Sequence, residues 1–81
     1  MGDHYRQQGE IDAAIASFQA IVYTDPGVET AQRTLMSLHL DLGRRGDALR
    51  IYEAYREYAE SFLGITPEQT TTALYRQITG R

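Results

Sequence analysis

The sequence predicts an all-α fold, a right-handed stack of antiparallel helix hairpins with about five helices, the first of them incomplete. Three observations support this prediction. Apolar residues recur at helical spacing in several stretches of the chain. Glycine and proline separate these stretches. A pattern of small and aromatic residues also returns after 34 positions, which is typical of proteins built from helical repeats.

A helix is expected over residues 11–22, because six apolar residues there fall on one face. They are Ile11, Ala14, Ile15, Phe18, Ile21 and Val22. Pro26 cannot continue this helix, so it is expected to end in the segment TDPG. Asp25, just before the proline, is a candidate cap for the helix that follows.

Two further helices are expected over residues 28–42 and 47–62. The segment LGRRG separates them, and Gly43 or Gly46 can adopt the positive φ that ends a helix. The helix over 47–62 has apolar residues on two faces, so it is expected to lie between two neighbouring helices.

The last helix is predicted to begin at Pro67. Thr66 is its expected N-cap, and Gln69 completes a Thr-x-x-Gln capping box. Three apolar residues are expected to point inward, namely Ala73, Leu74 and Ile78. Gly80 follows the expected end of the helix.

The repeat predicts which residues pack most closely. Ala14 matches Ala48, and Phe18 matches Tyr52, at the offset of 34 positions. A small residue lets two helices approach each other closely. Because protein interiors are packed as densely as crystals, large side chains must fill the space beside such a crossing. We therefore expect these two alanines at helix crossings and these two aromatic residues in the core.

Composition excludes several classes of protein. The net charge of −3 argues against a nucleic-acid surface, which needs basic residues to neutralise phosphates. No apolar run approaches the ~18 residues of a membrane span, and the first residues do not form a secretory signal. The chain has no cysteine, which fits a cytoplasmic protein and removes disulfides and thiolate metal sites.

No residue cluster indicates catalysis, a cofactor or a metal ion. His4 and His39 are the only histidines and lack the spacing of a metal pair. His39 takes the place of an aromatic residue in the repeat, so we expect a packed, hydrogen-bonded side chain. Glu53, Glu57 and Glu60 have helical spacing among arginines and are expected to form a solvated, ion-paired face. The sequence therefore predicts a protein that is not an enzyme.

Arg44, Arg45 and Arg50 form the one small basic cluster. They can stabilise the C-terminal dipole of the preceding helix or contact an anionic partner, and the first role is favoured. Tyr23, Tyr58 and Tyr75 can be packing residues or part of a recognition surface, with packing favoured.

The segment GEIDAAIASFQAIVYTDP resembles the tetratricopeptide-type helical repeat, with its glycine, its alanine, an aromatic residue four positions later and a final Asp-Pro. A second copy, GRRGDALRIYEAYREYAE, keeps Gly43, Ala48 and Tyr52. The resemblance implies that residues 1–8 are the tail of a first helix. It also implies that residues 1–81 form a single domain taken from a larger protein.

In tetratricopeptide arrays the first helix of each hairpin lines a groove that holds partner segments. The matching positions in this chain are Arg6, Gln7, Thr30, Arg33, Ser37, Leu40 and Asp41. This resemblance implies one possible function, that of a peptide-binding adaptor or chaperone-like scaffold.

A narrower resemblance concerns residues 48–81, which are similar to the run A-L-x-x-Y…L-G-I-x-P…L-Y-x-x-I of the bacterial transcriptional activator domain. The matching residues are Ala48, Leu49, Tyr52, Leu63, Gly64, Ile65, Pro67, Leu74, Tyr75 and Ile78. This resemblance implies a regulatory module of a bacterial transcription factor that works by protein–protein contact. The implied partners are a second copy, a DNA-binding domain of the parent protein or the transcription machinery, without direct contact to nucleic acid.

Overall fold

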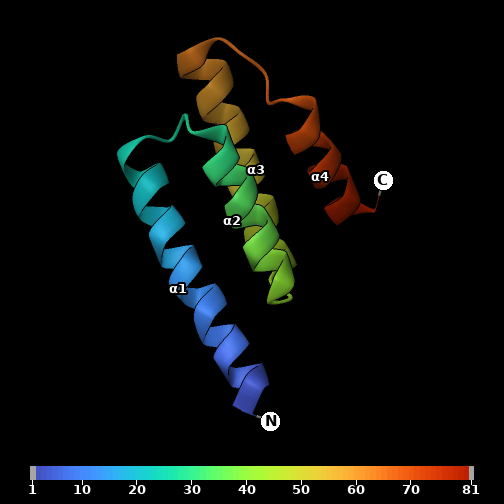
Figure 1. The fold of residues 1–81 in the computed structure, drawn as a ribbon. Helices are drawn as coiled ribbons and strands as arrows, with labels where there is room; N and C mark the ends of the chain where they lie inside the picture. Colours follow the sequence, from blue (N-terminus) through green and yellow to red (C-terminus); the bar gives the residue numbers. More distant parts are fainter. Residues whose placement is uncertain (1, 81) are drawn as a thin grey trace.

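The computed structural model describes the backbone of residues 2–80 and the side chains of residues 7–80. Within this range the chain is helical and contains no strand, so the predicted all-α class is confirmed. Figure 1 shows the elements α1 (Gly2–Thr24), α2 (Glu29–Asp41), α3 (Arg45–Tyr58), the π-helical stretch η1 (Ala59–Leu63) and α4 (Gln69–Thr79).

Helix α2 packs against α1 on one side and against α3 on the other. Helix α4 packs against α3 and makes a smaller contact with α2. As a result, α1 and α4 lie at opposite edges of the molecule (Figure 1). Each edge helix therefore has fewer neighbours to cover its apolar face.

Helix α1 differs from the prediction, because it runs unbroken through Gly9. Residues expected to form the tail of one helix and the start of the next are thus part of one helix. Gly9 does not adopt a positive φ, and its neighbours Gln7, Gln8 and Glu10 are all good helix formers. Glycine costs a helix only about 1 kcal/mol relative to alanine, so these neighbours keep the helix continuous.

The loop between α1 and α2 is held by side chains that do not cap α2. The N–H of Gly27 donates to Asp25 Oδ1 at 3.0 Å, so Asp25 forms a local turn. Val28 is the N-cap of α2 and provides no side-chain hydrogen bond. The prediction that Asp25 caps α2 is therefore wrong. The side-chain amide of Gln32 instead stabilises the loop, because its Nε2 donates a hydrogen bond to the Pro26 carbonyl at 3.0 Å.

The end of α2 confirms the turn predicted at Gly43, which has a φ of 74°. The N–H of Gly43 donates to the Leu40 carbonyl, and that of Arg44 donates to the His39 carbonyl. These two bonds form a Schellman motif, which satisfies carbonyl groups at the end of the helix. Gly80 follows α4 with the same positive φ, also as expected.

The start of α4 is not where the capping box places it. The helix begins at Gln69, and the extended residue Glu68 is its N-cap, without a side-chain hydrogen bond. Thr66 and Pro67 lie in the connecting segment, so the predicted Thr66 cap is wrong. The reason is tertiary, because α2 supplies the acceptor for this helix terminus, as described below.

The core lies where α2, α3 and α4 meet. Its buried residues are Met36, Ala48, Tyr52 and Ile78. The ring of Tyr52 stacks on that of Tyr75, with 4.1 Å between the ring centroids and 9° between the planes. Ala14 and Phe18 on the edge helix α1 are only half-buried. The two halves of the repeat thus differ in burial.

We expect Ala48→Leu to lower the free energy of unfolding by about 1–3 kcal/mol. Ala48 is fully buried between the side chains of the core, so a larger residue forces its neighbours to shift. Urea unfolding followed by far-UV circular dichroism measures the change. Ala54→Leu is the matched control, because Ala54 is exposed on the same helix. Equal stability of the two variants would contradict the close packing at Ala48.

Candidate protein-interaction surfaces

A buried carboxylate joins three helices. Glu29, the first residue of α2, is only 8% exposed. Its Oε1 accepts a hydrogen bond from the Tyr55 hydroxyl of α3 at 2.7 Å. Its Oε2 accepts from the backbone N–H of Glu68 at 2.7 Å and from the Thr71 hydroxyl at 2.6 Å. Glu29 therefore provides the acceptor that α4 lacks within its own sequence.

Arg33 extends this network on the side of α2 that faces α4. Its Nη1 donates to Thr71 Oγ1 at 3.1 Å and lies 3.6 Å from Glu68 Oε2. The fully buried Thr71 hydroxyl thus donates one hydrogen bond to Glu29 and accepts another from Arg33. Because buried hydroxyl groups are costly when unpaired, this complete pairing holds α4 in one position.

The surroundings of Glu29 lower the pKa of its carboxyl. Burial raises this pKa, but the hydrogen bonds from Thr71, Tyr55 and the Glu68 N–H, together with the charge of Arg33, outweigh burial. The contact between Glu29 and Tyr55 has the opposite effect on the pKa of the Tyr55 phenol, which it raises. Burial and the hydrogen bond to Glu29 raise the pKa of Tyr55 far above its usual range. Glu29 is therefore ionised and Tyr55 neutral at pH 7.

We expect the network to make the fold acid-sensitive. The pKa of Glu29 in the folded chain lies below its ordinary value of 4.5, so the unfolded chain takes up the proton more readily. The stabilisation is present above pH 4.5 and is lost as the pH falls through the lowered folded pKa. Urea unfolding between pH 7 and pH 3 measures this loss. In Glu29→Gln the acid dependence should be shallower, and an unchanged slope would contradict the assignment.

A groove lies beside the network, between α2 and α4. It has a volume of about 630 Å³. Its lining residues are Arg33, Thr34 and Ser37 from α2 and Thr70, Ala73, Leu74 and Gln77 from α4. The residues from α2 are all polar, whereas α4 contributes the apolar Ala73 and Leu74. The one charged side chain of the groove, Arg33, is already engaged by Thr71 and Glu68.

The residues predicted to line a single partner groove are spread over several places. Arg33 and Ser37 lie in the groove between α2 and α4. Gln7 and Asp41 lie in another groove, between α1 and the end of α2. Thr30 is exposed, Leu40 is half-buried against the core, and the side chain of Arg6 lies outside the described residues.

A third groove, of about 850 Å³, lies between the start of α3 and the end of α4. We call it the arginine groove, and it is lined by Arg45, Leu49, Tyr75, Arg76 and Thr79. The three arginines of the predicted basic cluster have different surroundings in the structure. Arg44 lies 3.8 Å from Asp12, and Arg50 lies 3.2 Å from Asp47, whereas Arg45 faces the groove.

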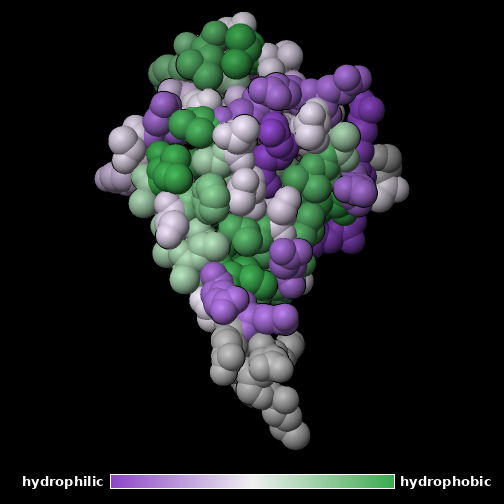
Figure 2. All heavy atoms as spheres, viewed as in Figure 1, coloured by the Kyte–Doolittle hydropathy of each residue, from purple (hydrophilic) through white to green (hydrophobic). Residues whose placement is uncertain are grey.

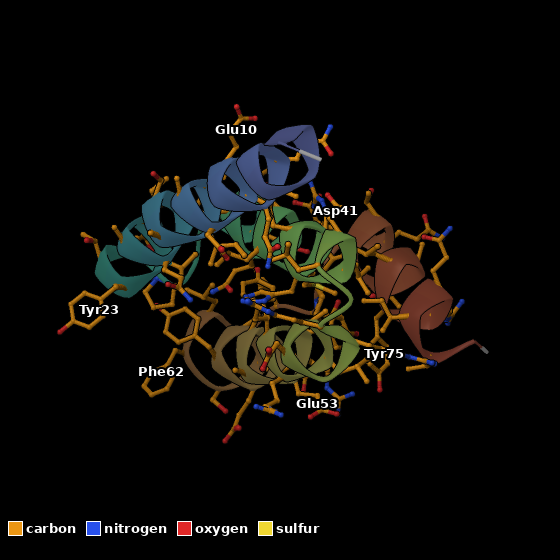
Figure 3. The ribbon with its side chains drawn as sticks, turned by 90° about the horizontal axis from the view of Figure 1, so that it is seen from below. Glu10, Tyr23, Asp41, Glu53, Phe62 and Tyr75 are labelled. Atoms are coloured by element: carbon orange, nitrogen blue, oxygen red, sulfur yellow. The ribbon has the colours of Figure 1, made fainter. Side chains whose placement is uncertain are left out.

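Large apolar side chains are exposed at one end of the molecule, which we call the apolar end. Its residues and their exposed fractions are Tyr23 91%, Phe62 79%, Ile65 48%, Ile21 43% and Leu63 43%. Figure 2 shows apolar atoms gathered over η1 and the segment after it. In Figure 3, Tyr23 and Phe62 project from the same side of the molecule. The Phe62 ring stacks on that of Tyr58 at 5.4 Å, which steadies it.

The described residues show few groups suited to metal or acid–base chemistry. No group of three or more His, Asp or Glu residues in this part of the chain could hold a metal ion. His39 is buried as expected, but its Nδ1 makes no hydrogen bond with any residue described. The expected packing of His39 is thus confirmed, but the expected hydrogen bond is not made at Nδ1. None of the described helices is both long and apolar enough to cross a membrane.

Sequence reasoning missed the network around Glu29. An acidic residue in the first turn of a helix is ordinary, so nothing local marked Glu29 as buried. Its partners lie 26, 39 and 42 positions along the chain. Only the tertiary arrangement brings them together.

Comparison with known proteins identifies the family. Searches of curated proteins and of solved structures found no match to the chain. The family model described as the bacterial transcriptional activator domain matches residues 2–79, a range that includes all four α-helices described above. The resemblance seen in residues 48–81 is therefore confirmed and extends over nearly the whole sequence. The chain belongs to the bacterial transcriptional activator domain family.

Proposed function

We propose that this chain is a protein-interaction and oligomerisation module, the regulatory helical domain of a bacterial transcriptional activator. The family match supports the regulatory role, since the family is named for transcriptional activation and is not a family of enzymes. The partners we propose are a second copy of the chain, a DNA-binding domain of the parent protein or the transcription machinery. The proposed place of action is the cytoplasm, where bacterial genes are transcribed.

The observation that best supports this proposal is the apolar end. Soluble proteins rarely leave several large apolar side chains exposed together unless another protein covers them. Tyr23 and Phe62 add aromatic surface, which is enriched in protein interfaces and often provides much of the binding energy. The net charge of −3 does not favour direct contact with DNA.

A tetratricopeptide-like right-handed stack in a larger protein remains part of the proposal. The offset of 34 positions between Ala14 and Ala48 supports it. The alternative function, a peptide-binding adaptor, would use the groove between α2 and α4. This alternative has weaker support, because Arg33 in that groove already pairs within the chain.

Two measurements test the proposed function. Sedimentation equilibrium of the 81-residue chain reports self-association. A reporter gene, driven by the whole chain fused to an unrelated DNA-binding domain, reports contact with the transcription machinery. We expect a positive result in at least one of the two. The double variant Tyr23→Ser, Phe62→Ser should abolish it, because it removes the two most exposed aromatic side chains.

Ser61→Ala is the matched control, since Ser61 is exposed and precedes Phe62. It should leave both measurements unchanged. If the native chain is monomeric and also inactive in the reporter, the proposed function is wrong. The same conclusion follows if the double variant behaves like the native chain in both measurements.

A further inference from the structure

Two arginines differ from the others. Six arginines have described side chains, and four of these lie 3.2–3.8 Å from a carboxylate, namely Arg33, Arg44, Arg50 and Arg56. The other two, Arg45 and Arg76, form no ion pair with any residue that the structure describes. Both are exposed. They come from different helices, yet both line the arginine groove.

The charge of the arginine groove is opposite to that of the molecule. No aspartate or glutamate of the described residues lines it, although the chain as a whole has a net charge of −3. An anionic segment therefore meets two arginines and no carboxylate in this groove, on a molecule whose net charge is negative. Such a contrast favours one docking position over others.

The apolar part of the groove is held by the core. Leu49 and Tyr75 are half-buried and pack against the core residues. The ring of Tyr75 is fixed by its stacking on Tyr52 at 4.1 Å, and Figure 3 shows Tyr75 on the side of α4 that faces α3. A rigid surface of this kind loses little conformational entropy when a partner binds.

Arg45 does not stabilise the helix to which it belongs. It is the first residue of α3, where a positive charge opposes the helix dipole. Arg76 lies in the last turn of α4, where a positive charge is favourable. Within the basic cluster, Arg44 and Arg50 have acidic partners, Asp12 and Asp47, whereas Arg45 has none among the described residues.

We propose that the arginine groove binds an acidic segment of a partner protein. An apolar side chain of that segment packs on Leu49 and Tyr75, and carboxylates on either side of it pair with Arg45 and Arg76. Guanidinium groups suit this role, because they bind carboxylates through two parallel hydrogen bonds. This inference rests on the proposed function and specifies the chemistry of one partner.

The test uses the intact 81-residue chain and a fluorescein-labelled peptide of twelve residues, in which Glu and Asp flank a central Leu. A second peptide replaces every Glu and Asp with Gln and Asn. Fluorescence anisotropy should show binding of the acidic peptide alone, and added salt should weaken it. Arg45→Gln with Arg76→Gln should weaken binding by at least about tenfold, as expected for interface arginines.

Arg50→Gln with Arg56→Gln is the matched control. It changes the net charge by the same amount at two exposed arginines of α3 outside the groove. Binding in this control should stay within about twofold of the native value, since exposed ion pairs contribute little. Circular dichroism checks that each variant is folded. If the Arg45→Gln, Arg76→Gln double variant does not fold, the single variants Arg45→Gln and Arg76→Gln are measured in its place.

Each of the following results would overturn the inference. Equal weakening in both double variants would show only general attraction between charges. Equal binding of the two peptides would show that the carboxylates do not matter. Peptide-induced amide shifts at Ser37 and Thr70, without shifts at Leu49 and Thr79, would place the peptide in the other groove.

A further control separates this inference from the proposed function. If Arg45→Gln with Arg76→Gln dissociates an oligomer of the native chain, the groove holds a second copy, and the partner proposed here is wrong. If acidic peptides fail to bind while the apolar end still supports self-association or reporter activity, only this inference fails. Loss of the effects ascribed to the apolar end would instead contradict the proposed function, whatever the peptide does.

Discussion

Replacing Glu29 with alanine is expected to lower the free energy of unfolding by about 3–5 kcal/mol, the cost of breaking a buried charged contact. The change removes the acceptor from three donors at once, the Tyr55 hydroxyl, the Glu68 N–H and the Thr71 hydroxyl. The two hydroxyl groups belong to residues that are at most 2% exposed, so water cannot easily replace the carboxylate. A buried donor left without a partner costs about 1–3 kcal/mol.

Urea unfolding at pH 7 measures this loss, and Glu53→Ala is the control. Glu53 is exposed on the outer side of α3, as Figure 3 shows, and its replacement should change stability by no more than about 0.5 kcal/mol. Hydrogen exchange at the amides of Thr72 and Ile78 should also quicken in Glu29→Ala, because α4 loses the carboxylate that holds its first turn, in which the Thr72 N–H donates to the Glu68 carbonyl. A loss no larger than that of Glu53→Ala would show that the network is not needed to hold α4.

The sequence predicted the parts of the fold that depend on nearby residues. Apolar spacing located the helices now seen as α2 and α3, and Gly43 marked the turn between them because few other residues adopt a positive φ. The predicted start of the last helix was wrong, because contacts with residues far along the chain outweighed the local sequence pattern. Thr66 and Gln69 have the sequence pattern of a capping box, but α4 begins only at Gln69, and the Glu29 carboxylate accepts a hydrogen bond from the N–H of its N-cap, Glu68.

The candidate surfaces show the same limit. Arg33 and Ser37 lie in one groove because they share a face of one helix, and helical spacing was enough to group them. Arg45 and Arg76 come from different helices, and their proximity depends on how α4 lies against α3. Their lack of acidic partners also became visible only once Asp12 and Asp47 were found beside Arg44 and Arg50.

Met36→Ala is expected to lower the free energy of unfolding by about 2–5 kcal/mol. Met36 has no exposed surface and packs in the cluster with Ala48, Tyr52 and Ile78. These neighbours come from α3 and α4, so shortening the Met36 side chain leaves a cavity that three helices surround. Tyr52 is held by its stacking on Tyr75 and cannot readily move into the space. If the cavity stays open, the loss of unfolding free energy should therefore lie in the upper part of the range of about 2–5 kcal/mol.

Two control variants separate the cavity from the loss of apolar surface. Met36→Leu nearly preserves volume and should cost less than about 1.5 kcal/mol. Ile65→Ala removes an apolar side chain that is 48% exposed and should have a much smaller effect than Met36→Ala. If Met36→Ala costs no more than Ile65→Ala, the core does not lie at the meeting point of α2, α3 and α4. If it destabilises all three helices in one cooperative transition, α4 is an integral part of the folded unit, and both grooves that it lines depend on this core.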